Sequence, residues 1–260
     1  MRISFDLISD LHIETWDSFD WTGQATSQFC ILAGDVAKDR EIVLETLDHL
    51  SRCYRMVFYI DGNDEHKYFM GEIGQSYNDL NQAIGKIPNV VFLQDSVIVM
   101  DGIAIIGTNG WWGFDLDHNI DSDDTRRWWE SYQIDPTNSQ YVEDLSRTDA
   151  AYIIKTVQKL QRHPDVKKII IVTHTVPRKD LVDHDISLEG SYKLNCMGNS
   201  LMSLALNTDT ESKIHTWCFG HYHNSVDRII DGIRYVNNCR GRGDTEYSNP
   251  VYFPKRIEID

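Results

Sequence analysis

The stretch ISFDLISDLH, residues 3–12, holds the pattern that decides the fold of this chain. Its apolar run from Ile3 to Ile8 is short and rich in β-branched and aromatic residues, which is typical of a buried strand. Asp10 and His12, two potential metal ligands, follow this run directly. We therefore expect a strand that delivers a carboxylate and an imidazole to its carboxyl end.

Four more apolar runs end in the same way. They lie at residues 29–34, 56–60, 169–173 and 217–220, and each is followed closely by Asp, Asn or His. In open α/β sheets, sites form in the crevice at the carboxyl ends of the strands. The five strands would therefore bring seven potential metal ligands to one place: Asp10, His12, Asp35, Asn63, His174, His221 and His223.

These ligand types indicate which ions could bind. Imidazole suits Zn, Fe, Mn and Ni, whereas carboxylate and amide oxygens suit harder ions. A mixed nitrogen and oxygen set without thiolate favours a hydrolytic metal over an iron–sulfur or structural zinc site. Seven ligands are too many for one tetrahedral ion, but they suffice for two ions if one carboxylate bridges. Two metals roughly 3.5–4 Å apart clamp the attacking and leaving oxygens of a phosphoryl displacement.

Five sequence blocks occur in the order that is found in a known superfamily. They are Asp10-Leu11-His12, Gly34-Asp35, Gly62-Asn63, His174 and Gly220-His221-Tyr222-His223. With these blocks, from residue 3 to about residue 240, the chain resembles the calcineurin-like metallophosphoesterases, in particular small bacterial and phage-type members. The resemblance implies an α/β fold: a four-layer αββα sandwich of two mixed β-sheets flanked by helices, with a dimetal site at the C-terminal ends of the strands.

The resemblance also implies two ligand sets and a reaction. One metal would be held by Asp10, His12, Asp35 and His223. The other would be held by Asp35, Asn63, His174 and His221, so that Asp35 bridges. The two divalent ions would be Mn²⁺, which we favour, or Fe²⁺/Fe³⁺, Zn²⁺ or Ni²⁺. A hydroxide between them would attack phosphorus. We therefore expect a phosphodiesterase or phosphatase that acts on small phosphate mono- or diesters.

The block Gly62-Asn63-Asp64-Glu65 departs from the superfamily. Most relatives have a histidine in place of Asp64, and that histidine stabilises the transition state or protonates the leaving oxygen. An ionised Asp64 would do neither and would repel phosphate, and two nearby cations would keep its pKa low. Either His66 reaches into the site instead, or His66 is an exposed loop histidine and the leaving group needs no acid. The candidate catalytic residues are thus Asp35, Asp64 and His66.

Four residues are candidates for contact with the substrate. Arg40 stands at the start of a predicted helix, where it would either bind phosphate or lie on the surface. The segment from Thr175 to Gly198 follows a ligand and is expected to line the substrate pocket, because loops on a rigid scaffold commonly carry specificity. The candidate substrate contacts are Arg40, Asn63, Arg178 and Tyr192.

At 260 residues, the chain is expected to form a single metallophosphoesterase domain over residues 1–260. Helices are predicted at 40–54, 76–86, 144–161 and 198–206, and further strands at 90–93, 97–100, 103–107, 226–230, 233–236 and 255–259. Residues 109–143 interrupt the pattern with Trp111, Trp112, Trp128 and Trp129 and with several Asp. We expect a cap-like insertion over the site. Its Trp rings would form its own core or stack on a nucleobase or aromatic leaving group.

The net charge of −15, from 25 basic and 40 acidic side chains, disfavours nucleic acid as a partner. A small phosphate ester is therefore the expected substrate, although a nuclease with a local basic groove stays an alternative. A second alternative is a catalytically weak metal-binding scaffold for protein interaction. Arg240 and Arg242 form a small basic spot near the end of the chain, which is either a solvated turn, the reading that we favour, or a phosphate site.

The five cysteines are odd in number and show no CxxC spacing. This cysteine usage favours reduced thiols in a cytoplasmic protein. We see no signal-peptide pattern and no apolar stretch long enough to span a membrane, so no membrane partner is expected. The sequence makes no prediction about the oligomeric state.

Overall fold

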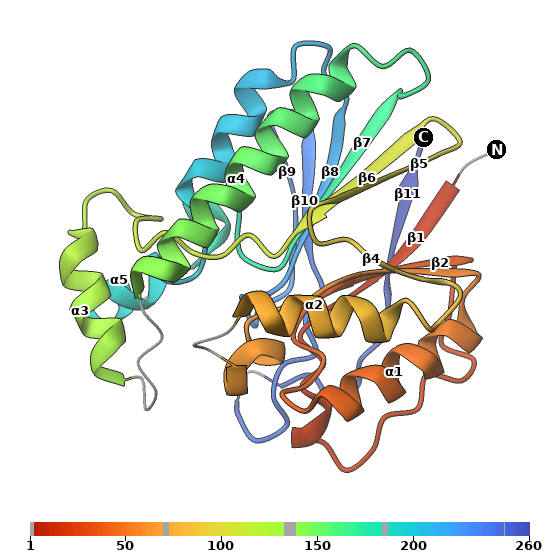
Figure 1. The fold of residues 1–260 in the computed structure, drawn as a ribbon, viewed down its shortest axis with the longest axis horizontal. Helices are drawn as coiled ribbons and strands as arrows, with labels where there is room; N and C mark the ends of the chain where they lie inside the picture. The colour runs from red at the N-terminus through yellow and green to blue at the C-terminus, as the bar shows by residue number, and fades with distance from the viewer. Residues whose placement is uncertain (1–2, 70–72, 133–138, 184–186, 247) are drawn as a thin grey trace.

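The computed structural model describes residues 3–69, 73–132, 139–183, 187–246 and 248–260. Its eleven strands form two mixed sheets (Figure 1). The first sheet has the order β11-β1-β2-β3-β4. Its strands are β1 (Ile3–Ile8), β2 (Phe29–Ala33), β3 (Met56–Ile60), β4 (Val90–Phe92) and β11 (Lys255–Ile259). Strands β1 to β4 run parallel, and β11 pairs antiparallel with β1. The carboxyl ends of β1, β2 and β3 therefore meet at one edge.

The second sheet has the order β5-β6-β7-β8-β10-β9. Its strands are β5 (Ser96–Met100), β6 (Ile103–Thr108), β7 (Lys168–Thr173), β8 (Ile214–Phe219), β9 (Val226–Ile230) and β10 (Ile233–Asn237). The four central strands β6, β7, β8 and β10 are parallel, and the two outer strands are antiparallel to their neighbours. Ligands that come after β7 and β8 therefore emerge at one edge as well.

The two sheets pack face to face, because side chains alternate between the faces of each strand. Phe5, Ile31 and Phe58 from the first sheet share a buried cluster with Ile170 and Val236 from the second. This shared cluster forms the central layer of the core. It places the carboxyl ends of β1, β2 and β3 beside those of β7 and β8.

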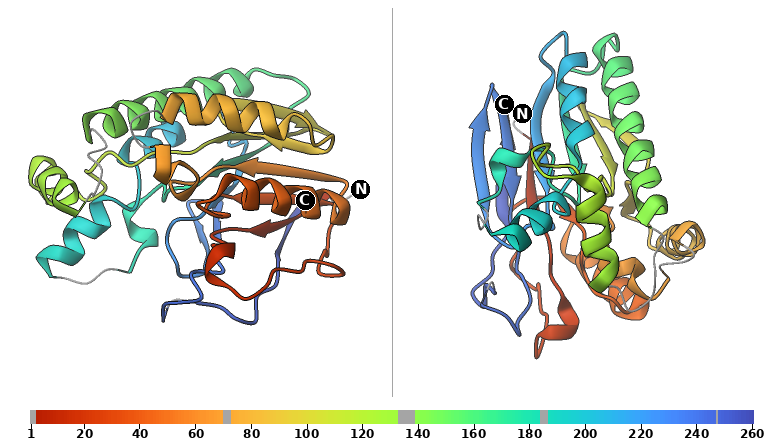
Figure 2. Two further views of the ribbon diagram at one scale, coloured as in Figure 1. Left: turned by 60° about the horizontal axis from the view of Figure 1, so that its bottom comes forward. Right: turned by 90° about the vertical axis from the view of Figure 1, so that its left-hand side faces the viewer.

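Helices cover the outer face of each sheet (Figures 1 and 2). Helices α1 (Arg40–Cys53) and α2 (Ile73–Ile84) bury Leu47 and Leu80 against the first sheet. Helix α4 (Ser139–Gln161) and the 3₁₀ helix Ser200–Thr208 pack on the second sheet. The arrangement is the αββα sandwich that the sequence predicts.

Several predicted boundaries shift in the structure. Helix α2 begins at Ile73 rather than at residue 76, and α4 begins at Ser139 rather than at residue 144. The predicted helix at 198–206 is a 3₁₀ helix, whose first turn is capped by the Asn199 side chain. Two helices were not predicted, α3 (Ser122–Tyr132) and α5 (Leu188–Asn195).

Two expectations about the chain as a whole can be compared with the structure. All five cysteines are free, as expected for reduced thiols. In the described parts of the chain, no helix combines the length and the apolar character that crossing a bilayer requires.

Candidate dimetal site

The residues at the carboxyl ends of the strands adopt an unusual backbone conformation. Asp10, His12, Asp35 and His221 all have positive φ angles, of 51°, 42°, 53° and 63°. Residues other than glycine rarely occupy this left-handed region, and such outliers cluster at functional sites. Hydrogen bonds hold the loops in place: the Asp10 amide donates to the Gly34 carbonyl at 2.9 Å, and the His221 amide donates to Asp10 Oδ1 at 2.8 Å.

Glycine is required directly before two of the ligands. A Cβ atom on Gly34 would lie 2.4 Å from His174 Nδ1, and one on Gly62 would lie 2.1 Å from Asp35 Oδ1. Both distances are too short for non-bonded atoms, so only glycine lets the ligand loops approach this closely. The Gly34-Asp35 and Gly62-Asn63 blocks therefore have a steric cause.

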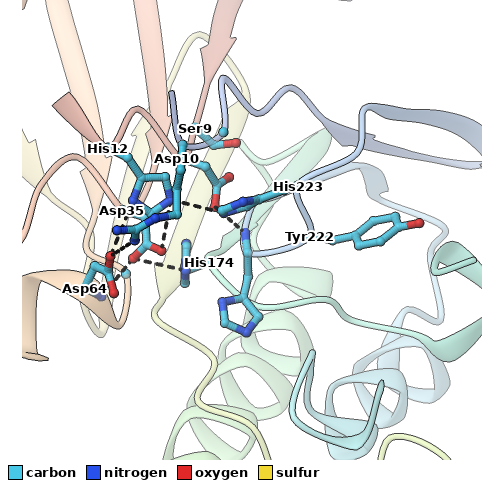
Figure 3. Close-up of polar contacts among 12 residues, drawn as sticks. Ser9, Asp10, His12, Asp35, Asp64, His174, Tyr222 and His223 are labelled. Atoms are coloured by element: carbon cyan, nitrogen blue, oxygen red, sulfur yellow. Dashed lines mark hydrogen bonds and ion pairs between the residues drawn. The ribbon is translucent and has the colours of Figure 1, made fainter. Parts of the chain in front are cut away.

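The first group of potential ligands comprises Asp10, His12, Asp35 and His223, whose ligand atoms all lie within 4.8 Å of one another. His12 Nε2 is 3.1 Å from His223 Nε2 and 3.7 Å from Asp35 Oδ2. His223 Nε2 is 3.6 Å from Asp10 Oδ1. Figure 3 shows these side chains pointing toward one another from separate loops.

The second group comprises Asp35, His174 and His221. His174 Nε2 is 3.4 Å from Asp35 Oδ1, and it is 3.2 Å from Asn63 Oδ1, which adds the amide to this group. Asp35 thus presents one oxygen to each group. These two groups coincide with the two ligand sets that the resemblance implies, and ligation itself stays a prediction. A third group of potential ligands, His12, Glu14 and Asp64, lies beside the first and shares His12 with it.

The donor set fits divalent ions. Asp10 Oδ2 is buried and has no hydrogen-bond partner among the described residues, so a cation would satisfy it. His174 Nδ1 lies 2.9 Å from the Ala33 carbonyl, to which it donates, and this leaves Nε2 to ligate. A histidine ligand commonly has its second nitrogen fixed by such a contact.

Burial and neighbouring charges shift the pKa values of the potential ligands in different directions. Burial would raise the pKa of Asp35, but the neighbouring His174 and His12 hold that pKa well below its usual value. Burial and the charge of His174 lower the pKa of His221 to about 4. Burial also opposes charge on His174, yet Asp35 and Asp10 raise the pKa of His174 to about 10. An incoming metal must therefore displace a proton from His174.

A cavity of about 640 Å³ opens beside the two groups. This size is typical of a small-molecule site. Its lining includes the potential ligands His12, Asp35, Asn63, His221 and His223, together with Asp64, Arg242 and residues of α5 such as Lys193 and Leu194. Part of the segment 175–198 therefore lines this cavity, and its contact with a substrate stays a prediction.

Three predicted substrate contacts do not reach this cavity. The Arg40 guanidinium lies 3.3 Å from Asp79 of α2. Arg178 binds Asp180 at 2.7 and 2.8 Å and lines a separate, neighbouring cavity. The Tyr192 ring packs against Trp128, with 5.8 Å between the centroids. Of the four candidates, only Asn63 lines the main cavity, because local partners hold the other three side chains elsewhere.

The insertion at 109–143 packs against a potential ligand of the site. Its Trp111, Trp112 and Trp129 form a small buried cluster, and the Trp112 ring stacks on His221 at 5.5 Å. None of its described residues, 109–132 and 139–143, lines the main cavity, whereas α5 does. The cap-like role of the insertion stays a prediction. Figure 1 shows α3 beside α5, away from the two sheets.

His66 does not reach the site either. It is fully buried, its Nε2 hydrogen-bonds Asp61, and its Nδ1 lies 2.9 Å from Ser76 Oγ. Both ring nitrogens are thus engaged on the side of α2. The structure contradicts the expectation of an exposed loop histidine, and the two partners of the ring do not favour contact with a leaving group.

We accordingly expect His66→Ala to act on stability and not on the leaving group. Breaking a buried pair costs about 3–5 kcal/mol, because the buried Asp61 carboxylate would lose its His66 partner and keep the Asn109 amide, 3.2 Å away. Urea unfolding should show this loss, while the exposed His118→Ala serves as the control. The rates on aryl esters with good and with poor leaving groups should fall by one common factor. A larger fall for poor leaving groups would instead make His66 the general acid.

Two residues near the site were not assigned a role from the sequence. Glu65 is buried and accepts hydrogen bonds from the amides of Asp35, Val36 and Gly62. Burial, with Asp35 adding to it, raises the pKa of Glu65 to about 8. The only sequence signal was its place at the end of the Gly62-Asn63-Asp64-Glu65 block. The other residue is Arg242, which begins a turn, since its carbonyl accepts from the Thr245 amide at 3.1 Å, and which also lines the cavity.

No family model matches the sequence. The chain is 25% identical to an uncharacterised protein of Acanthamoeba polyphaga mimivirus, covering 97% of this chain and 95% of that protein. A phosphopantetheinyl hydrolase (PptH) from Mycobacterium tuberculosis has a similar structure, with a TM-score of 0.74, 16% identity and coverage of 98% of this chain and 96% of that one.

A dimetal phosphatase from Danio rerio is also similar, with a TM-score of 0.55 and 13% identity over 94% of this chain and 89% of that one. These likenesses concern the fold. They agree with the ordered sequence blocks and with the two ligand groups at the strand ends. The chain therefore has the fold of the calcineurin-like metallophosphoesterase superfamily, as its sequence predicts.

Proposed function

We propose that this protein is a dimetal phosphoesterase that hydrolyses small phosphate mono- or diesters in the cavity beside Asp35. The observation that carries the proposal is that two groups of ligand atoms, each compact enough for one ion, share that carboxylate. When bound, two divalent ions would activate water as a nucleophile and offset the negative charge of the phosphate. Mn²⁺ is our first choice, with Fe²⁺/Fe³⁺, Zn²⁺ and Ni²⁺ as alternatives that suit the same nitrogen and oxygen donors.

The chain's own residues would place the substrate. Asn63, His221 and His223 line the cavity floor and would set the position of the phosphate relative to both groups. Helix α5 and the turn after it contribute Leu194 and Met197 to the wall, where the organic part of an ester would pack. Such a wall favours a small or slender ester.

The two alternative functions have less support. Among the charged residues of the lining other than histidine, Asp35, Asp64, Asp183 and Glu189 outnumber Lys193 and Arg242, which is not the basic groove that a nuclease needs. A metal-binding scaffold would not need a cavity of ligand size beside the metal groups. An enzyme acting on a small ester accounts for both features.

We expect the purified protein with Mn²⁺ to hydrolyse bis(4-nitrophenyl) phosphate, 4-nitrophenyl phosphate or both. Treatment with EDTA should lower the rate by at least about 10³-fold, since metal ions would supply several kcal/mol of transition-state stabilisation. Added Mn²⁺ should restore the rate. A phosphopantetheinyl-serine peptide belongs in the same panel, since the hydrolase of M. tuberculosis shares the fold. If no ester is cleaved with Mn²⁺, Fe²⁺, Zn²⁺ or Ni²⁺, the proposal is wrong.

A further inference from the structure

Asp64 lines the main cavity, and the structure places two cationic side chains beside it. Asp64 is only 5% exposed. Its Oδ2 atom lies 3.1 Å from Arg242 Nη1 and 3.9 Å from Lys38 Nζ. The Asp64 amide donates a hydrogen bond to Asp35 Oδ1 at 2.9 Å, which holds Asp64 beside the two groups of potential metal ligands. The negative charge that would repel a phosphate is thus offset by two positive ones.

Arg242 belongs to a loop that is fastened to the first ligand loop. The Gly241 amide donates to the Asp10 carbonyl at 2.9 Å, and the Gly243 amide donates to Thr15 Oγ1 at 2.9 Å. A Cβ atom on Gly243 would lie 2.5 Å from the Thr15 carbonyl oxygen, so the two loops approach as closely as backbones can. The Arg242 backbone is therefore positioned before any substrate arrives.

The guanidinium has donors left for a ligand. Nη1 donates to Asp64, and Nε lies 3.6 Å from the exposed Asp244 carboxylate. Nη2 has no partner among the residues that the structure describes. The side chain is one quarter exposed, at 25%, and it lines the same cavity as His12, Asp35 and Asn63. Arg242 is therefore a positively charged side chain with an unpaired N–H donor beside the two groups of potential metal ligands.

From this geometry we infer that Arg242, held in place by Asp64, binds the phosphate group of the substrate and stabilises the charge that develops on it. The inference rests on the proposed phosphoesterase function. Arginine is suited to the task because its planar fork matches phosphate oxygens and is always charged. Arg242 would thus supply positive charge and hydrogen bonds to the phosphate, and no proton to the leaving group. Asp64 is accordingly a positioning residue.

The first test replaces Arg242 by an uncharged residue. Arg242→Gln should lower kcat/KM for an aryl phosphodiester by about 10²–10³-fold, the loss typical of one charge-stabilising donor. It should also weaken the binding of inorganic phosphate at least tenfold in calorimetry, and the Mn²⁺ content should be unchanged. Arg242→Lys, which keeps a point charge without the fork, should fall between wild type and Arg242→Gln.

The matched control is Arg234→Gln. Arg234 forms a comparable pair with Asp227, at 2.8 and 2.9 Å, on strands β10 and β9 outside the main cavity. This change removes an arginine from an aspartate pair without touching the site. It should leave kcat/KM and phosphate affinity as in wild type.

A double-mutant cycle tests whether Asp64 acts through Arg242. Asp64→Asn should lower kcat/KM about tenfold, and Asp64→Asn with Arg242→Gln should lose no more than Arg242→Gln alone. Additive losses would mean that Asp64 acts on its own. Wild-type activity and phosphate affinity in Arg242→Gln would overturn the inference while leaving the proposed function intact. An inactive wild type would instead defeat the proposed function, and phosphate calorimetry would still test Arg242.

Discussion

Asp35→Asn is expected to lower kcat/KM for an aryl phosphodiester by at least about 10³-fold and to reduce the bound metal from two ions to at most one. Asp35 directs Oδ2 toward His12 at 3.7 Å and Oδ1 toward His174 at 3.4 Å. An asparagine offers a single oxygen, so it can serve one group only. Its NH₂ group would then face the other group, where it cannot ligate.

Asp10→Asn provides the comparison for Asp35→Asn. Asp10 belongs only to the first group, so its replacement should weaken one metal site and spare the other. Mn²⁺ titration calorimetry and elemental analysis would separate the two patterns. If Asp35→Asn binds two ions with the affinity of wild type, Asp35 is not the shared ligand.

The parts of this structure that sequence could predict are those that depend on local pattern. The runs that end before Asp10 and His174 alternate or are wholly apolar, and such patterns report burial on a strand. Parallel strands then place the residues at their carboxyl ends along one edge of the sheet. For this reason the fold and the gathering of the seven residues could be predicted from the sequence.

The parts that sequence could not predict depend on contacts between distant residues. Asp64 and Arg242 are 178 positions apart, and contacts between loops, such as those of Gly241 with Asp10 and of Gly243 with Thr15, bring them together. His66 is two positions from Asp64, yet a buried partner, Asp61, turns it the other way. Proximity in sequence was a poor guide to proximity in the site.

The amino-acid composition of the insertion at 109–143 was also an incomplete guide to the structure. Its Trp residues signalled a compact apolar cluster, and such a cluster forms around Trp111 and Trp112. Composition alone does not indicate, however, which part of the molecule such a cluster packs against. The cluster packs under His221, and the cavity wall is built by α5, whose short polar sequence gave no clear helical signal.

Glu65→Ala is expected to destabilise the protein by at least about 3 kcal/mol, because each buried donor left without a partner costs about 1–3 kcal/mol. The Glu65 carboxylate accepts from the amides of Asp35 at 3.2 Å, Val36 at 2.7 Å and Gly62 at 2.8 Å, and from the Tyr59 hydroxyl at 3.1 Å. Urea unfolding measures the loss.

The same change should also weaken the metal site, because Glu65 clamps the two loops that carry Asp35 and Asn63. Glu65→Ala should therefore lower the Mn²⁺ affinity although Glu65 belongs to neither ligand group. Glu65→Gln should lie in between, since its amide keeps one acceptor oxygen but turns an NH₂ group toward a backbone donor. Glu45→Ala, an exposed acid on α1, is the control and should change neither property. A Glu65→Ala variant as stable as this control, or with full Mn²⁺ affinity, would show that the loops hold their left-handed geometry without the clamp.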